Sequence, residues 1–327
     1  MKISFEQLTS EFKRVLLKLN FSEERAALCA RIFAENSRDG VYSHGLNRFP
    51  VFVQAVKDGL IAIDAEPAAV SRNGVVETWD GHLAPGMYTA TRAMERAIAL
   101  AKENGMGCVA VKNTNHWMRG GTYGWQAAAA GCIGICATNS IANMPPWGGT
   151  EARLGNNPLV IAIPRQKGSV VLDMAISQFS YGKLQEYDLQ GKELPFEGGY
   201  DEHGNLTKDP AQIRASERPL PIGYWKGSGL SLVLDVLVAS LSGGRSVEQI
   251  TQAGAEAGVS QFFLCIDASK LDDAVADAII AYTKSSALTD KDGEIRYPGE
   301  SSLAKRHQHE QEGIPVNEEI WQQVQEL

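Results

Sequence analysis

The chain has 327 residues, of which 44% are hydrophobic and 21% are charged, and its formal net charge is -8 at pH 7. These values are typical of a globular protein with a large core and about two domains, and they exclude a disordered chain. The negative charge argues against a nucleic acid or an anionic membrane as the main partner, because both require a basic face.

The start of the chain and its five cysteines favour a cytoplasmic protein. The first residues form a charged amphipathic helix with a Ser4/Gln7 capping box, without the apolar stretch of a signal peptide. The longest apolar run, Leu230–Leu241, contains Asp235 and is too short to span a bilayer. The cysteines form no C-x-x-C pair, so we expect reduced thiols in the core rather than disulfides or metal ligands.

Hydrophobic spacing predicts helices through residues 4–58, followed by alternating strands and helices. We expect strands at 75–79, 107–112, 133–139, 158–164, 169–174 and 261–267, and helices at 88–104, 123–130, 226–241 and 272–285. Residues 184–221 are rich in Gly, Pro and charge, which is typical of a long excursion that caps a site. The alternation indicates an α/β fold with a helical N-terminal part.

His44 precedes Arg48 by four residues. If a helix begins at or before His44, with Ser43 as its N-cap, both side chains lie on one face and reach the same ligand. An imidazole can exchange a proton with a carbonyl group, and a guanidinium can hold a carboxylate. Arg48 would lower the pKa of His44 and a bound carboxylate would raise it. The alternative is a surface histidine beside a surface arginine.

A second imidazole and cation, His116 and Arg119, follow the expected strand at 107–112 in a loop that leads through Gly120-Gly121 into a helix. Loops between a strand and a helix gather the polar groups of α/β enzymes. We therefore expect His116 in a binding site, the alternative being a histidine satisfied by local backbone groups.

A dinucleotide fingerprint of the G-x-G-x-x-G type is absent in its proper context, because Gly105–Ala110 follows a helix and precedes a strand. A better anion site is Trp225–Gly229, where free N–H groups, the helix dipole and the Lys226 ammonium would meet. A simple turn is the alternative there. No cluster of side chains has metal-ligand spacing, and we expect no metal.

Motifs along nearly the whole chain make it similar to the type 2 malate/L-lactate dehydrogenase family of NAD(P)-dependent oxidoreductases. The motifs are Ser43–Arg48, Gly155–Leu159, Asp173-Met174, Tyr181–Lys183, Asp201–Pro210, Lys226-Gly227 and Arg296–Glu300. The resemblance implies an α/β mixed-sheet, non-Rossmann NAD(P)-binding domain of the malate/L-lactate (sulfolactate) dehydrogenase-like fold. Residues 71–295 would bind cofactor and substrate, while residues 1–70 would form a helical part that carries the catalytic histidine and packs with residues 296–327.

The resemblance also implies roles for single residues. His44 would be the proton donor, Arg48 would hold the substrate carboxylate, His116 would lie in the substrate site and Asp201 would orient His44. Nucleotide contacts would come from Ser169, Val170, Val171, Leu172, Asp173, Met174, Ala175, Trp225, Lys226, Gly299, Glu300 and Ser301. The chain departs from the family pattern at Asn156 and at Gly199-Tyr200, just before Asp201.

The implied activity is hydride transfer from NAD(H), or NADP(H), to a 2-keto sugar acid in a cytoplasmic homodimer whose other partner is the small-molecule keto or hydroxy acid. Three alternatives stay open. One is a dehydrogenase of the same family acting on malate, lactate, ureidoglycolate or a cyclic imino acid. The second is a non-catalytic sugar-acid binding protein, and the third is a metal hydrolase built on His44 and His116.

Overall fold

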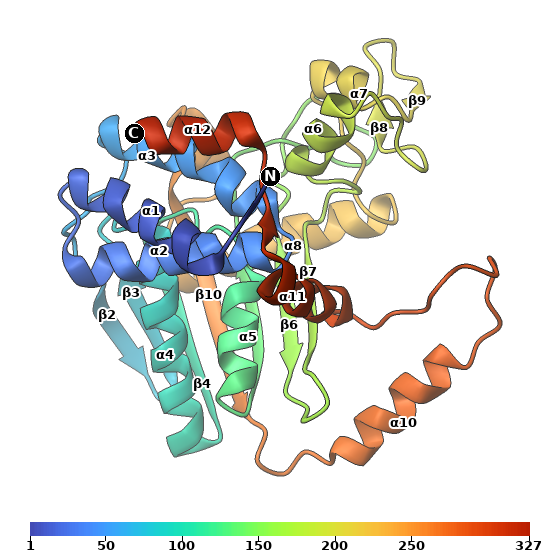
Figure 1. Cartoon of the computed structure of the whole chain (residues 1–327). Helices are drawn as coiled ribbons and strands as arrows, with labels where there is room; N and C mark the ends of the chain where they lie inside the picture. The colour runs from blue at the N-terminus through green and yellow to red at the C-terminus, as the bar shows by residue number, and fades with distance from the viewer.

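A mixed sheet of seven strands forms the centre of the molecule (Figure 1). The computed structural model describes all 327 residues. The strand order is β2-β3-β4-β10-β5-β6-β7, and β3 and β4 are its only parallel neighbours. The strands are β2 (Ala68–Asn73), β3 (Val76–Asp80), β4 (Met106–Asn115), β5 (Cys132–Thr138), β6 (Leu159–Ile163), β7 (Val170–Met174) and β10 (Ala257–Asp267). The predicted mixed-sheet α/β fold is therefore confirmed.

Helices cover both faces of this sheet. On one face, α4 (Gly86–Asn104) contacts β4 and β10, and α5 (Gly121–Ala129) contacts β5, β6 and β7. On the other face, α8 (Trp225–Ser242) contacts β10, β4 and β5. Successive side chains of a strand point to opposite faces, so Phe263 packs in the cluster that contains α4 residues and Phe262 in the cluster that contains α8 residues.

The two ends of the chain share a helical layer. The helices α1 (Phe5–Lys18), α2 (Glu23–Arg38), α3 (Phe49–Lys57) and α12 (Glu318–Glu326) contribute to one hydrophobic cluster. Strand β1 (Lys2–Ile3) pairs antiparallel with β11 (Ile314–Pro315), and α11 (Glu300–Glu312) contacts α2. Burial of apolar side chains from both ends holds this layer together.

The excursion expected at residues 184–221 is a small folded unit (Figure 1). It contains α6 (Tyr181–Leu189), β8 (Gly199–Tyr200), β9 (Leu206–Thr207) and α7 (Pro210–Ser216). Buried Leu184, Leu194 and Ile213 form its own hydrophobic cluster. The beginning of α6 lies against the turn that contains Ser43, since a Cβ at Gly182 would be 2.8 Å from the Cβ of Ser43.

Two elements differ from the expectation. Strand β2 was missed because all six of its residues are exposed, which removes the alternation that marks a half-buried strand. Helix α10 (Asp273–Lys284) lies at the expected place but buries none of its residues. Figure 1 shows it off both faces of the sheet, and Asp277 pairs it with Arg165 and Lys167 in the turn between β6 and β7. The remaining helix is α9 (Val247–Gln252). None of the helices combines the length and apolar character that crossing a bilayer requires.

Candidate active site

His44 and Arg48 lie on two successive 3-10 turns, Tyr42–His44 and Leu46–Arg48, and not on one α-helix as the spacing predicted. The helix α3 begins only after Arg48. Gly45 separates the turns with φ -109° and ψ -125°, a conformation that is neither helical nor extended and that ends the first turn. The prediction of a single helical face was therefore wrong.

Gly45 adopts this conformation because it packs directly on α2. A Cβ at this position would lie 2.2 Å from Ser37 Oγ and 3.0 Å from the carbonyl oxygen of Phe33. Contacts this short are not tolerated by a side chain, so only glycine fits between the turns and helix α2.

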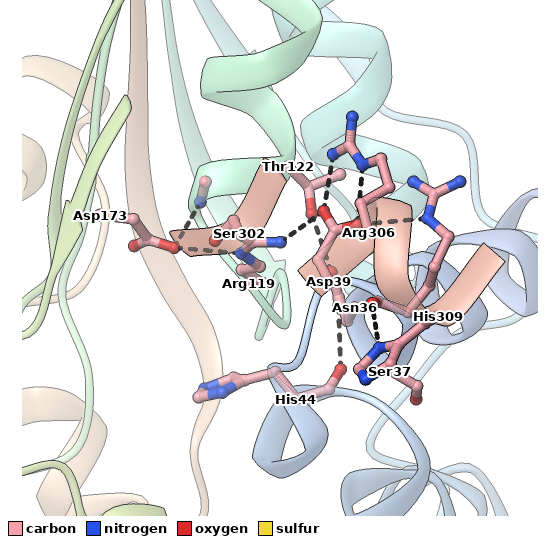
Figure 2. A network of polar contacts seen from close by, with 12 residues as sticks. Asn36, Ser37, Asp39, His44, Arg119, Thr122, Asp173, Ser302, Arg306 and His309 are labelled. Atoms are coloured by element: carbon pink, nitrogen blue, oxygen red, sulfur yellow. Dashed lines mark hydrogen bonds and ion pairs between the residues drawn. The ribbon is translucent and has the colours of Figure 1, made fainter. Parts of the chain in front are cut away.

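Side chains of α2 hold the turn that carries His44 (Figure 2). Asn36 Nδ2 donates to the backbone oxygen of His44 at 2.9 Å, and Asn36 Oδ1 accepts from Thr122 Oγ1 at 3.0 Å. The next hydroxyl, Ser37 Oγ, accepts from the backbone N–H of Leu46 at 2.9 Å. The position of the imidazole is thus set by buried polar groups of a neighbouring helix.

The structure brings His44 and His116 together. Their rings are stacked, with centroids 5.7 Å apart and planes 15° from parallel. The backbone N–H of Met118 donates to His116 Nδ1 at 3.1 Å, so the neutral ring of His116 carries its proton on Nε2. On the other ring, Ser43 Oγ lies 3.0 Å from His44 Nδ1. Sequence analysis predicted both imidazoles but not that they stack.

Both imidazoles are held neutral. Burial lowers the pKa of His44 to about 3, with His116 and Arg48 adding to the effect and Asp173 opposing it. Burial and then Arg48 lower the pKa of His116 to about 3. An anion bound between the rings and Arg48 would favour the charged imidazole, and would therefore supply the site with a proton.

The guanidinium of Arg48 is available to a ligand. It donates no hydrogen bond within the chain, its nearest acidic partner is Glu256 at 3.8 Å, and 38% of its side chain is exposed. It lines a cavity of about 180 Å³ together with His116, Glu256 and apolar side chains such as Phe52 and Leu60. A free guanidinium beside two neutral imidazoles can clamp a carboxylate through paired N–H donors.

Arg119, in contrast, is not the second carboxylate clamp that its spacing from His116 suggested. Its side chain is 6% exposed and donates to Asp39 at 2.9 Å and to Ser302 at 3.0 Å, with Asp173 at 3.5 Å (Figure 2). Burial alone would raise the pKa of Asp39, but Arg306 and Arg119 lower it below its usual value. This buried arginine therefore holds α2, α5 and α11 together.

The structure does not bring Asp201 to His44. Its carboxylate accepts from the backbone and side-chain amides of Asn205, at 2.8 and 3.0 Å, in the exposed turn between β8 and β9. These bonds lower the pKa of Asp201. The expectation that Asp201 orients His44 is not met, because a four-residue turn uses its side chain locally.

Two of the three predicted nucleotide-binding segments meet at the sheet edge. Strand β7 contains Val170–Met174 and is the last strand of the sheet, with Ser169 and Ala175 flanking it. The backbone N–H of Val171 donates to Pro298 at 2.9 Å, next to Gly299 at the start of α11. Glu300 of that helix pairs with Lys284 of α10, and Ser301 accepts from Arg296 at 3.1 Å. Within β7, Asp173 lies close enough to His44 to raise the pKa of its imidazole.

The third segment lies near the other end of β7. The backbone of Ile222 donates to Ile176 at 2.8 Å, and α8 begins three residues later at Trp225. The backbone N–H groups of Trp225 and Gly227 have no acceptor in the chain, and Lys226 Nζ lies over the indole of Trp225. Free N–H groups and an ammonium at a helix start fit a phosphate. The glycine at position 227 has a packing reason of its own, because a Cβ there would clash with the backbone of Ile222.

Sequence reasoning missed Glu256 and Asn36. Glu256 sits in a turn before β10 and Asn36 within α2, and no local motif marks either residue. Only the fold brings them to residues 44 and 48. No group of three or more His, Cys, Asp or Glu side chains is arranged to hold a metal ion.

Comparison with known proteins places this site in context. The sequence profile described as malate/L-lactate dehydrogenase matches residues 3–325. The chain is 48% identical over 333 residues to the 2,3-diketo-L-gulonate reductase of Citrobacter koseri and 47% identical to that of Escherichia coli K12, each over 100% of both chains.

Two solved structures illustrate the shared fold. Malate dehydrogenase from Entamoeba histolytica has a TM-score of 0.93 at 25% identity, covering 100% of this chain and 96% of that chain. Sulfolactate dehydrogenase from Methanocaldococcus jannaschii has a TM-score of 0.89 at 29% identity, with the same coverage of both chains.

Proposed function

Because this chain belongs to the malate/L-lactate dehydrogenase family and is an oxidoreductase, we propose that it reduces a 2-keto sugar acid. The proposed reaction converts 2,3-diketo-L-gulonate to 3-dehydro-L-gulonate. Support comes from the full-length identity to reductases with this name. The observation that carries the proposal is the free guanidinium of Arg48 beside the stacked imidazoles of His44 and His116.

Arg48 binds the carboxylate of the substrate and sets the position of the adjacent keto carbon. His116 donates from Nε2 to an oxygen of the bound acid. His44 takes up a proton when the anion binds, and gives it to the keto oxygen as this oxygen gains negative charge. The stacking of the two rings supports a role for both imidazoles in contacting the same acid.

A nicotinamide cofactor would bind along β7. The family implies this cofactor, which supplies the hydride when bound. The backbone of Ser169 to Ala175 and the start of α11 would hold one part of the nucleotide. The free N–H groups at the start of α8, with Lys226, would hold a phosphate. We propose NADH as the usual reductant, with NADPH as the alternative.

We also propose a cytoplasmic homodimer. All five cysteines are buried and unpaired, which is typical of proteins in a reducing compartment. Leu232, Val233 and Val236 are more than half exposed on α8. A contiguous apolar face of this kind marks a protein interface.

The test is oxidation of NADH and of NADPH by the purified protein with 2,3-diketo-L-gulonate, oxaloacetate, pyruvate and a cyclic imino acid, and reduction of NAD⁺ or NADP⁺ with ureidoglycolate. We expect the diketo acid to have the highest kcat/KM. A higher value for one of the others would transfer the assignment to that substrate. Binding of sugar acids without any turnover would contradict the proposal and favour a binding protein.

A further inference from the structure

Glu256 faces the guanidinium of Arg48 from the turn between α9 and β10. Its Oε2 is 3.8 Å from Arg48 Nη2, and its Oε1 is 3.4 Å from the backbone nitrogen of Ile141. Both contacts are too long for strong hydrogen bonds. Only 24% of the side chain is exposed, and burial raises the pKa of Glu256 while Arg48 opposes the rise. The carboxylate of Glu256 is thus half-buried beside Arg48 and can still accept hydrogen bonds from a ligand.

The cavity next to this pair has two unlike walls. Arg48, Glu256 and His116 form a polar wall, while side chains such as Phe52 and Leu60 form an apolar one. At about 180 Å³ it holds a short carbon chain and not a large ligand. A substrate hydroxyl near the clamped carboxylate complements the polar wall, because it can donate to Glu256, whose acceptor capacity Arg48 does not use at 3.8 Å. The C–H groups of the same chain would lie on the apolar wall.

We propose that Glu256 determines substrate specificity, by selecting acids whose far end is uncharged and hydroxylated over acids with a second carboxylate. The inference rests on the proposed function, in which Arg48 holds the first carboxylate. A second carboxylate in the cavity would face Glu256 in a half-buried site whose one guanidinium, Arg48, already holds the first carboxylate. A methyl end, as in lactate, would desolvate the Glu256 carboxylate and leave it only its long contacts to the Ile141 N–H and to Arg48.

The test compares two acids that the enzyme cannot reduce, L-gulonate as the hydroxylated monoanion and L-malate as the dianion. Their dissociation constants are measured by calorimetry for the wild type, Glu256→Gln and Glu248→Gln. The first variant keeps the shape of the side chain and removes its charge. The control removes an equal charge from the exposed face of α9, and so measures the effect of net charge alone.

We expect the wild type to bind L-gulonate more tightly than L-malate. In Glu256→Gln, L-malate should bind about tenfold more tightly, as for one weakened like-charge contact, while L-gulonate binds equally or slightly less well. The control should retain the wild-type ratio. Equal changes for both acids in Glu256→Gln, or no preference in the wild type, would overturn the inference.

The steady-state assay with the keto acids separates this outcome from the proposed function. If the selectivity of binding changes as expected but no keto acid is reduced, the reaction is wrong and the role of Glu256 stands. If 2,3-diketo-L-gulonate is reduced and the selectivity does not change, the reaction stands and the role of Glu256 is wrong.

Discussion

The chemistry of the site depends on how a few side chains are held. His44 and His116 are neutral because burial and the nearby guanidinium disfavour their charged forms, and the Met118 N–H selects the tautomer of His116. Arg48 retains its hydrogen-bond donors because no acceptor of the chain lies close enough to use them. A bound acid anion would therefore pair with the Arg48 guanidinium. It would also raise the pKa of the imidazoles, so that one of them takes up a proton.

Replacement of His44 by asparagine should remove the proton donor and leave the carboxylate clamp in place. We expect kcat for reduction of the keto acid to fall by roughly 10²- to 10⁴-fold, and the dissociation constant of L-gulonate to change only a few-fold. Steady-state kinetics and calorimetry provide both numbers. His203→Asn, in an exposed turn, is the matched control. A variant with nearly normal kcat would show that another group donates the proton.

The lowered pKa values also predict how stability depends on pH. The folded state keeps His44 and His116 neutral to about pH 3, whereas the unfolded chain binds protons below about pH 6.5. The free energy of unfolding should therefore decrease as the pH falls from 7 to 5, by up to about 2 kcal/mol for each histidine. Urea unfolding of the wild type and of the His44→Asn, His116→Asn double variant at both pH values measures this. Equal losses in both proteins would argue against buried neutral imidazoles.

At the level of secondary structure, the site lies where helices, 3-10 turns and an edge strand come together. Helix α2 supports the two 3-10 turns, α5 supplies Thr122, and the edge strand β7 runs past them. The expected helix through His44 is absent because Gly45 must approach α2 closely. The helices α4 and α8 were predicted nearly to their ends. Each packs one side on the sheet, so the spacing of its apolar residues follows the helical period.

Gly45→Ala should disrupt this junction. The added Cβ would meet the backbone nitrogen of Ser37 at 2.8 Å as well as its hydroxyl, so a rotamer change cannot relieve the clash. We expect the free energy of unfolding to fall by about 1–3 kcal/mol, and kcat to fall with it as His44 shifts. Gly229→Ala, which meets no atom within 4 Å, should leave the stability unchanged or slightly higher. Urea unfolding of both variants decides the comparison.

The whole chain exposes more apolar surface than an isolated subunit needs. Helix α8 is apolar on its outer side as well as toward the sheet, and α10 exposes Val275, Ile279 and Tyr282 while burying none of its residues. Figure 1 shows α10 on an arm that continues into α11, whose start is part of the proposed nucleotide site. Association would therefore cover this surface and hold the start of α11 in place at the same time.

A charged face on α8 should separate the proposed homodimer. We expect Val233→Lys with Val236→Lys to halve the mass measured by light scattering during gel filtration, because two ammonium groups cannot be buried without partners. Leu189→Lys, an exposed position on α6, should leave the mass unchanged. A wild-type protein that is already monomeric at micromolar concentration would refute the proposal.

Local pattern was enough to predict the α/β class and most of the sheet, and to single out His44, Arg48 and His116 as candidate site residues, because hydrophobic period and motif letters are properties of neighbouring residues. The stacked imidazoles, the structural use of Arg119 and Asp201, and the approach of Glu256 to Arg48 all required the folded chain. These features join residues that lie far apart in sequence or depend on atomic contacts across elements. Packing decides such contacts, and the spacing of residues along the chain does not encode packing.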